Sequence, residues 1–169
     1  MNKIVILFPL ILGGCVQPLK TEVDVTEISP FIEFNVNDTV AVINTQPSHD
    51  KIVVADLDIM AFTGSKFDFT ETLVAITEQE LVKRKATISS KNPAKELSMS
   101  VDNLSCKKGM FGPSCTTKIS ISIGNGYSAI YTAYSENGYD VHDTASHTLG
   151  EAVSAMFRDP KVVTYMTDS

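Results

Sequence analysis

The sequence contains no tryptophan, and only three cysteines and three histidines occur among its 169 residues. It has no basic stripe, and its formal net charge of −6 argues against nucleic acid as a partner. The motifs of serine hydrolases, zinc proteases, P-loop enzymes and dinucleotide-binding enzymes are missing. Beyond the first residues, no apolar run reaches the length of a membrane-spanning helix, which is about 20 residues. These absences predict an acidic domain that is not an enzyme and that holds no cofactor or metal.

The N-terminus, in contrast, carries an export signal. Lys3 supplies a positive charge, and residues 4–12 form an apolar run of the size found in secretory signals. This run is too short to cross the hydrocarbon core of a bilayer. It ends in Leu12-Gly13-Gly14-Cys15, which resembles the lipobox of bacterial lipoproteins: a branched apolar residue, two small residues and a cysteine.

The lipobox resemblance implies that the chain is cut between Gly14 and Cys15 and that the Cys15 thiol accepts a diacylglyceryl group. In such proteins the new amino group is often acylated as well. Two or three acyl chains anchor stably, because each buried CH₂ contributes about 0.8 kcal/mol. Val16 follows the cysteine where an aspartate would favour the inner membrane, so the same resemblance favours the outer membrane. The alternative is an ordinary cleaved signal peptide with a fortuitous cysteine.

Two further cysteines, Cys106 and Cys115, lie in the exported part of the chain, where oxidation is permitted. Between them runs Lys-Lys-Gly-Met-Phe-Gly-Pro-Ser, whose glycines and proline suit a tight loop between two strands. We therefore predict a structural disulfide that contributes roughly 2–3 kcal/mol. The alternative, a redox or metal-binding pair, is disfavoured because the spacing is not CxxC and no histidine lies nearby.

The chain divides into a signal peptide over residues 1–14, a lipidated N-terminus and tether over 15–38, and a single domain over 39–169. Strands are predicted where apolar and polar residues alternate, most cleanly from Thr116 to Ile123. The Gly-Asn-Gly that follows is typical of a hairpin turn. Strands are expected at residues 39–44, 51–60, 96–104, 116–123 and 127–135, with a short one starting near 86–89 and a possible edge strand within 28–36.

Two helices are expected, each with an apolar stripe that faces the core. The first runs to about Lys85 after residues 62–66 interrupt the strand pattern, and the second ends at Pro160. Candidate N-caps are Asp68 or Thr70 for the first helix and Asp143, Thr144 or Ser146 for the second. The stripe of the second helix comprises Ala145, Leu149, Ala152, Val153, Met156 and Phe157. The predicted fold is therefore α+β, an antiparallel sheet of about five strands with two helices packed on one face.

Two groups of residues are candidates for contact with a partner or a lipid. Met110 and Phe111 occupy the tip of the disulfide loop, where an apolar pair could enter a lipid or protein surface. The alternative is that Phe111 folds back over the sheet. Tyr127 and Tyr131 share one face of the last strand, but tyrosines at alternating strand positions also simply pack well.

The candidates for chemistry are weaker. Asp56 and Asp58 share one strand face and could act as paired acids, or they could form the solvated face of a half-exposed strand. His142 and His147 are five residues apart, whereas a helical pair that shares a metal would be three or four apart. Solvated histidines at the start of the helix are the alternative.

The C-terminal part of the chain adds a second resemblance. Residues 152–166 read Ala-Val-Ser-Ala-Met-Phe-Arg-Asp-Pro-Lys-Val-Val-Thr-Tyr-Met. Together with the lipobox, the hairpin and the long helix, this segment resembles the uncharacterised YajG-type lipoproteins of Gram-negative bacteria. More distantly, the pattern is similar to the auxiliary lipoproteins of lipid-trafficking transporters. The resemblance implies an accessory role in the envelope and supplies no catalytic residues.

Three hypotheses for function follow. The first is a non-enzymatic lipoprotein that faces the periplasm and assists an envelope protein complex, such as a secretion, pilus, flagellar or lipid-transport machine. The second is a lipid- or glycan-binding lipoprotein that uses the Met110–Phe111 loop or the tyrosines. The third is an envelope hydrolase, which a double Asp56→Asn and Asp58→Asn variant with full function would exclude.

Overall fold

The computed structural model describes residues 15–23, 33–58, 60–136 and 140–168 of the chain. The signal peptide over residues 1–14, with the cleavage residue Gly14, lies outside the described residues. The described segments form three helices and eight strands, which confirms the predicted α+β class. In chain order they are β1 (Cys15–Pro18), β2 (Thr39–Asn44), β3 (Lys51–Leu57), β4 (Met60–Ser65), α1 (Lys66–Lys83), β5 (Thr87–Ile88), β6 (Lys95–Lys108), β7 (Pro113–Ile123), β8 (Ser128–Glu136), α2 (Val141–Met156) and α3 (Pro160–Thr167).

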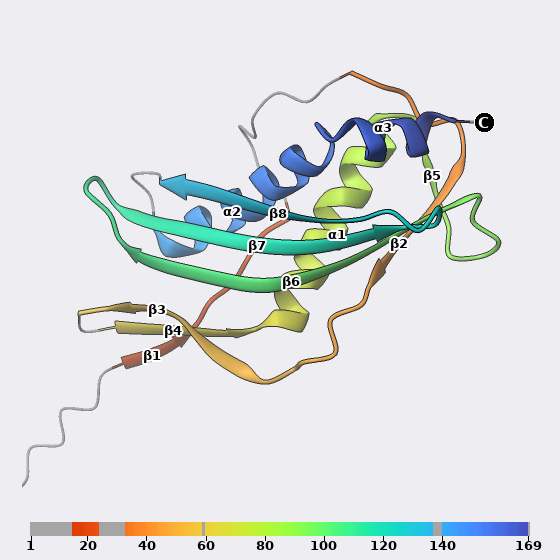
Figure 1. The fold of residues 1–169 in the computed structure, drawn as a ribbon. Helices are drawn as coiled ribbons and strands as arrows, with labels where there is room; N and C mark the ends of the chain where they lie inside the picture. Colours follow the sequence, from red (N-terminus) through yellow and green to blue (C-terminus); the bar gives the residue numbers. More distant parts are fainter. Residues whose placement is uncertain (1–14, 24–32, 59, 137–139, 169) are drawn as a thin grey trace, which may run out of the picture.

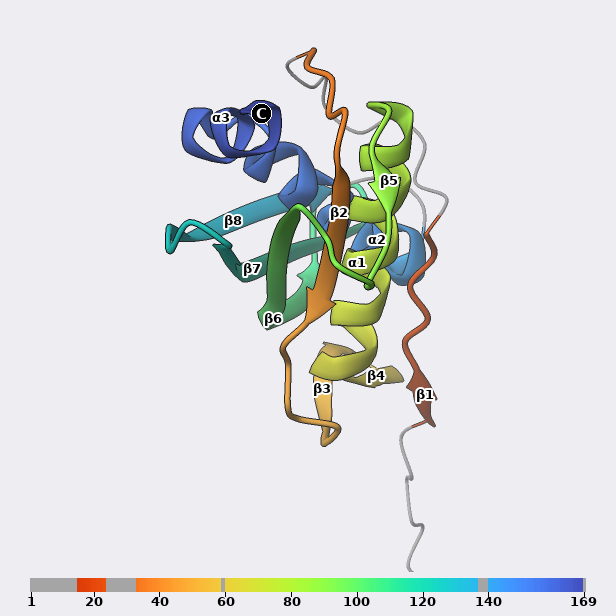
Figure 2. The same cartoon turned by 90° about the vertical axis from the view of Figure 1, so that its right-hand side faces the viewer.

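The long strand β6 is the centre of the sheet and has different neighbours on its two edges. One edge pairs along its length with β7, which in turn pairs with β8. The other edge is divided, because the first part of β6 pairs with β2 and the last part pairs with β3. Figure 2 shows the resulting order from β8 through β7, β6 and β2 to β5. Beyond β3 the sheet continues through β4 to β1.

The prediction of a purely antiparallel sheet of about five strands was wrong. The pairs β1–β4, β2–β5, β2–β6 and β3–β6 are all parallel, and β1 and β4 were not expected as strands. Alternation of apolar residues reports which face of a strand is buried, and it says nothing about the direction of the neighbouring strand. Very short strands such as β1 give almost no periodic signal at all.

Residues 51–65 form a hairpin where one strand and a break were predicted. β3 ends at Leu57, Asp58 adopts a left-handed conformation with φ of 54°, and β4 returns from Met60 to Ser65. A shift of register in β3 buries two successive residues, Val54 and Ala55. The expected alternation through Val53 therefore fails.

Helices α1 and α2 lie across the same face of the sheet (Figure 1). The stripe predicted for α2 is confirmed, since all six of its residues are buried. Both helices begin earlier than expected. The Ser65 hydroxyl caps α1 by accepting from the Asp68 amide at 3.1 Å, and the Asp140 carboxylate caps α2. The sequence alternatives for these caps were wrong because both true caps precede the apolar stripes by several residues. None of the helices in the described segments combines the length and apolarity needed to cross a membrane.

The opposite face of β6, β7 and β8 carries mostly small hydroxyl side chains. Where the structure describes the chain, no helix packs against this outer sheet face. Two larger apolar groups, Ile130 and Tyr134, are exposed on it. The outer sheet face comprises Ser98, Ser100, Thr116, Lys118, Ser120, Ser122, Ser128, Ile130, Thr132 and Tyr134.

The N-terminal segment differs from the predicted tether. Its first four described residues form β1 at the edge of the sheet, and Leu19 behind them is buried. The Lys20 amide then donates to the His142 ring at 3.0 Å, and the Glu22 amide donates to the Ser146 hydroxyl at 2.9 Å. Residues 15–23 therefore belong to the folded domain. Residues 28–32 of the possible edge strand lie outside the described residues. Residues 33–36 form no strand, and Val36 is buried.

Candidate functional site

The predicted disulfide between Cys106 and Cys115 is confirmed. The two residues face each other directly across the antiparallel β6–β7 pair, with their Cα atoms 4.1 Å apart. Both are buried on the face that the helices cover. The disulfide therefore joins the two strands of the β6–β7 hairpin shortly before its tip.

The tip of this hairpin is a tight turn over Gly109–Gly112. The Gly109 amide donates to the Gly112 carbonyl oxygen at 2.7 Å, which leaves Met110 and Phe111 at the outermost positions. Their side chains are 84% and 79% exposed. Phe111 therefore does not fold back over the sheet.

A carboxylate from another strand holds the backbone of this turn. The Oε1 atom of Glu136, the last residue of β8, accepts from the Met110 amide at 2.9 Å and from the Phe111 amide at 3.4 Å. The Tyr134 hydroxyl donates to the other carboxylate oxygen at 2.6 Å. Gly109 is required here, because a Cβ on it would lie 2.7 Å from the backbone carbonyl oxygen of Gly112. The hydrogen bonds to Glu136 therefore fix the backbone of the turn in the conformation that exposes Met110 and Phe111.

Sequence analysis did not single out Glu136. The hydrogen bonds from the Tyr134 hydroxyl and from the Phe111 and Met110 amides lower the pKa of its carboxyl below the usual value of 4.5. Because the folded-state pKa is the lower one, Glu136 stabilises the fold above its usual pKa. This contribution is lost as the pH falls through the folded-state value.

We expect the amide protons of Met110 and Phe111 to report this titration. Their NMR chemical shifts should change with a midpoint below pH 4.5, since protonation removes the charged acceptor. A Glu136→Gln variant should abolish the transition and leave the shifts of α2 unchanged. Shifts that stay constant down to pH 3 in the wild type would contradict the role given to Glu136.

The anchor candidate Cys15 lies at the same end of the molecule as this turn. It is the first residue of β1, its thiol is exposed and free, and it pairs with Met60 at the start of β4. Met60 pairs in turn with Leu57 across the β3–β4 hairpin. The turn of that hairpin contacts β6, because the Asp58 carboxylate lies 3.0 Å from Lys108 Nζ. Figure 1 shows the start of β1 and the tips of both hairpins at the left end of the view, with the β6–β7 tip at the top, β3 and β4 in the middle and the start of β1 below them.

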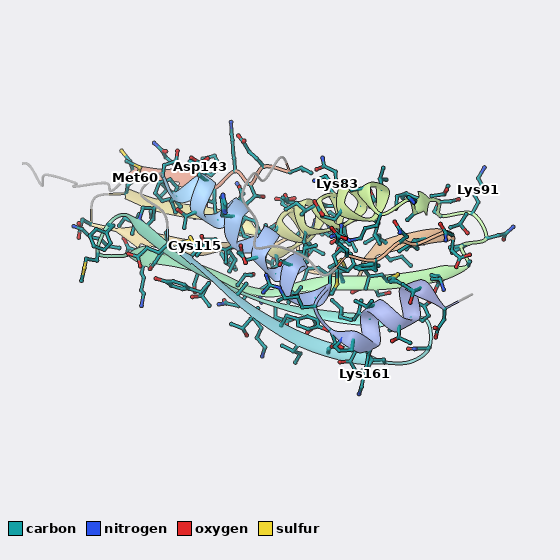
Figure 3. The ribbon with its side chains drawn as sticks, turned by 90° about the horizontal axis from the view of Figure 1, so that it is seen from above. Met60, Lys83, Lys91, Cys115, Asp143 and Lys161 are labelled. Atoms are coloured by element: carbon teal, nitrogen blue, oxygen red, sulfur yellow. A yellow bond between two sulfur atoms is a disulfide. The ribbon has the colours of Figure 1, made fainter. Side chains whose placement is uncertain are left out.

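The side-chain view gives the same arrangement from above. Met60, Cys115 and Asp143 are labelled toward one end of the domain in Figure 3, and Lys91 is labelled toward the other. We call the first of these the anchor end, and it comprises Cys15, the β3–β4 turn and the Met110–Phe111 turn. Cys15 and the Met110–Phe111 pair, which the sequence singled out separately, therefore lie at the same end of the domain, on strands that β4 and β3 separate.

Tyr127 and Tyr131 lie elsewhere and have an internal role. Both hydroxyls donate to Asp159 Oδ2 at 2.7 Å, and Asp159 Oδ1 accepts from the Lys161 amide at the start of α3. Burial and the bond to Asp159 raise the pKa of Tyr131. Burial alone would raise the pKa of Asp159, but the bonds from both tyrosines outweigh it and hold that pKa below 3.8. The hydrogen bonds from Tyr127 and Tyr131 to Asp159 therefore hold the start of α3 against β8.

We expect Asp159→Ala to lower the free energy of unfolding by about 2–3 kcal/mol, since it removes a charged acceptor and a helix cap. Urea unfolding followed by circular dichroism measures this loss. Asp159→Asn is the matched control and should lose less, because asparagine still caps a helix. A change of less than about 0.5 kcal/mol for Asp159→Ala would place it among ordinary surface substitutions.

Tyr127 also borders a surface hollow of about 430 Å³ between α3 and the β7–β8 turn. Lys161 and Tyr165 line the same hollow, and the Lys161 ammonium lies 4.7 Å from the centre of the Tyr127 ring. Asp168 also lines this hollow, which is open to the surface.

The other candidates for chemistry are separated by the structure. Asp56 lies in β3, whereas Asp58 lies beyond its end and pairs with Lys108, so the two carboxylates do not share a strand face as predicted. His142 accepts from the Lys20 amide, and His147 is further along α2. Across the described segments, no group of three or more His, Cys, Asp or Glu side chains is placed to hold a metal ion.

No protein-family model and no curated protein sequence matches this chain. Among solved structures, the chain is similar to a crystal structure of a Xanthomonas campestris protein described by the family model DUF330. The identity is 10% and the TM-score is 0.47, over 89% of this chain and 94% of that one. A similarity of this size supports no inference about function, which has to come from the residues of this chain.

Proposed function

We propose that the protein is a non-enzymatic lipoprotein that is anchored through Cys15 in the outer membrane, faces the periplasm and assists an envelope protein complex. The lipobox supports the anchor, and the acidic, compact domain without a catalytic motif supports the accessory role. The observation that carries the proposal is the place of Cys15 in the fold. It is the exposed first residue of an edge strand, so acyl chains on it would attach directly to the folded domain.

Direct attachment matters because it limits the distance between the domain and the membrane surface. A long flexible tether would let the domain search a wide volume above the membrane. A domain attached through β1 stays next to the bilayer, and its outer sheet face extends away from the anchor end. Such a protein is suited to a partner that also sits at the membrane.

The test is a pull-down of the native lipoprotein after crosslinking in intact membranes, with mass spectrometry of what is recovered. The outer sheet face is the first place for a crosslinker, since Thr132 lies on it and no described helix covers it. We expect one envelope complex with the wild type and its loss with Cys15→Ala. Recovery of no envelope protein from any crosslinking position would overturn the accessory role.

A lipid- or glycan-binding function is the second candidate, and the exposure of Met110 and Phe111 favours its lipid form. In this case the pull-down would recover lipid in place of protein. A Met110→Ser and Phe111→Ser double variant separates the possibilities. If lipid still co-purifies with this variant, the turn is not the binding site.

A further inference from the structure

We propose that the Met110–Phe111 turn is a second membrane contact, which inserts into the same leaflet that holds the acyl chains of Cys15 and so fixes the anchor end against the bilayer. This inference rests on the lipidation of Cys15 in the proposed function and goes beyond it. It assigns a ligand, the interfacial region of a phospholipid bilayer, to the two most exposed large apolar side chains among the described residues.

The strand register places the turn slightly deeper than the anchor. Ala55 pairs with Cys106 in the parallel β3–β6 pair, so two residues further on Leu57 is level with Lys108. Leu57 pairs with Met60, and Met60 pairs with Cys15. Cys15 is therefore level with Lys108.

Met110 and Phe111 lie two to three residues beyond that level. One strand residue advances about 3.3 Å, and a turn advances less, so the two residues lie a few ångströms past Cys15 along the strand direction, and their side chains extend further. Apolar side chains of interfacial proteins enter the boundary between headgroups and acyl chains to a depth of about 5–10 Å. With Cys15 at the membrane surface, both side chains reach this boundary without any rearrangement of the fold.

The direction of β1 is consistent with this orientation. β1 runs parallel to β4 and leads from Cys15 away from the anchor end into the domain. The acyl chains are attached at the outer end of that strand, so they and the turn point to the same side. Figure 1 shows the start of β1 and the β6–β7 tip on that side.

The turn is built to keep its apolar pair outside the protein. Its amides are occupied by Glu136, and the disulfide closes the hairpin just behind it. Lys108 beside it is paired with Asp58, and the Glu136 carboxylate accepts three hydrogen bonds. The charges behind the tip are of opposite sign, since Lys107 lies near the Glu136 carboxylate and Lys108 is paired with Asp58. The outermost side chains are apolar, which suits insertion between lipids better than attraction to an anionic surface.

The lipid anchor also explains how two side chains suffice. An isolated pair of apolar residues binds a bilayer weakly, but a domain already anchored at Cys15 makes the second contact as an intramolecular event. The anchor keeps the turn close to the bilayer, so the effective concentration of the membrane around the turn is high.

The absence of tryptophan from the sequence gives a clean experiment. A Phe111→Trp variant places a single indole at the turn. The full lipidated protein is purified from membranes and reconstituted in phosphatidylcholine vesicles whose acyl chains carry bromine, a quencher of indole fluorescence. We expect a blue-shifted emission and quenching to about half of the intensity seen without bromine, as for a side chain at the acyl boundary.

A Val82→Trp variant is the matched control. Val82 is also an exposed apolar residue, but it lies near the C-terminal end of α1, next to Lys83, which Figure 3 labels well away from Met60. Its indole should show no quenching. Addition of 1 M salt should leave the quenching at Phe111→Trp unchanged, because salt screens charges and does not weaken apolar burial.

Two readouts separate the possible failures. Intact mass establishes whether Cys15 carries acyl chains, and the absence of that mass overturns the proposed function and this inference together. With the acyl mass present, equal emission and quenching for Phe111→Trp and Val82→Trp overturn the membrane contact alone. Quenching that disappears in 1 M salt overturns apolar insertion in favour of a charge contact.

Discussion

Cys15→Ala is expected to abolish the mature lipoprotein altogether. Without the thiol there is no acceptor for the diacylglyceryl group, and the cleavage that depends on this modification does not occur. Mass spectrometry of the wild type should show a chain that begins at Cys15 with the added mass of its acyl groups. The variant should keep residues 1–14 and carry no acyl mass.

The neighbouring residue gives the control for this experiment. Val16 is exposed in β1, as Cys15 is, so Val16→Ala changes the same strand without touching the thiol. It should be processed and acylated like the wild type. A Cys15→Ala protein that is still cut after Gly14 would show an ordinary signal peptide, and both the lipoprotein assignment and the membrane contact would be wrong.

Removal of the Cys106–Cys115 disulfide is expected to destabilise the fold. A Cys106→Ala and Cys115→Ala double variant should lose about 2–3 kcal/mol of unfolding free energy, because the unfolded chain regains the freedom that the closed loop denies it. Urea unfolding measures this loss. The wild type in reducing agent should unfold at nearly the same urea concentration as the variant.

Two comparisons make the disulfide result specific. Reducing agent should leave the unfolding of the double variant unchanged, since its only remaining cysteine, Cys15, has no partner in the chain. Wild-type protein whose unfolding midpoint does not move on reduction would show that strand pairing alone holds the hairpin together. In that case the hairpin tip would not need the disulfide to present Met110 and Phe111.

The sequence was informative where a pattern is local. The stripe of α2, the alternation in β7 and the pairing of Cys106 with Cys115 all depend on residues that are close in the chain. Strand β6 shows the limit of this reasoning. Its alternation holds up to Val101 and then shifts by one residue at a bulge, which returns Leu104 and Cys106 to the core. The local mark of this bulge is a pair of successive polar residues, Asp102 and Asn103, which a reading of strict alternation passes over.

The candidate site shows the same division. Met110 and Phe111 were identified as a possible contact from the loop that contains them, but their exposure could not be decided from it. Their exposure depends on Glu136, which accepts hydrogen bonds from both amides. Glu136 lies 26 residues after Met110 and 25 residues after Phe111. The position of Cys15 beside Met60 likewise depends on a parallel pairing that short strands do not announce.

The parallel pairing of β1 with β4 has a mechanical consequence. If Cys15 is held in a membrane and a partner pulls on the domain, the tension enters the fold along the axis of β1. Four consecutive residues of β1 are in register with β4, and the amide of Leu19 continues the pairing to the Thr63 carbonyl. The hydrogen bonds of this pair are therefore loaded in shear, all at once, and not opened one after another as in a zipper. The β1–β4 pair therefore resists tension best along the axis of β1, which is the direction of a pull between a membrane anchor at Cys15 and a partner on the domain.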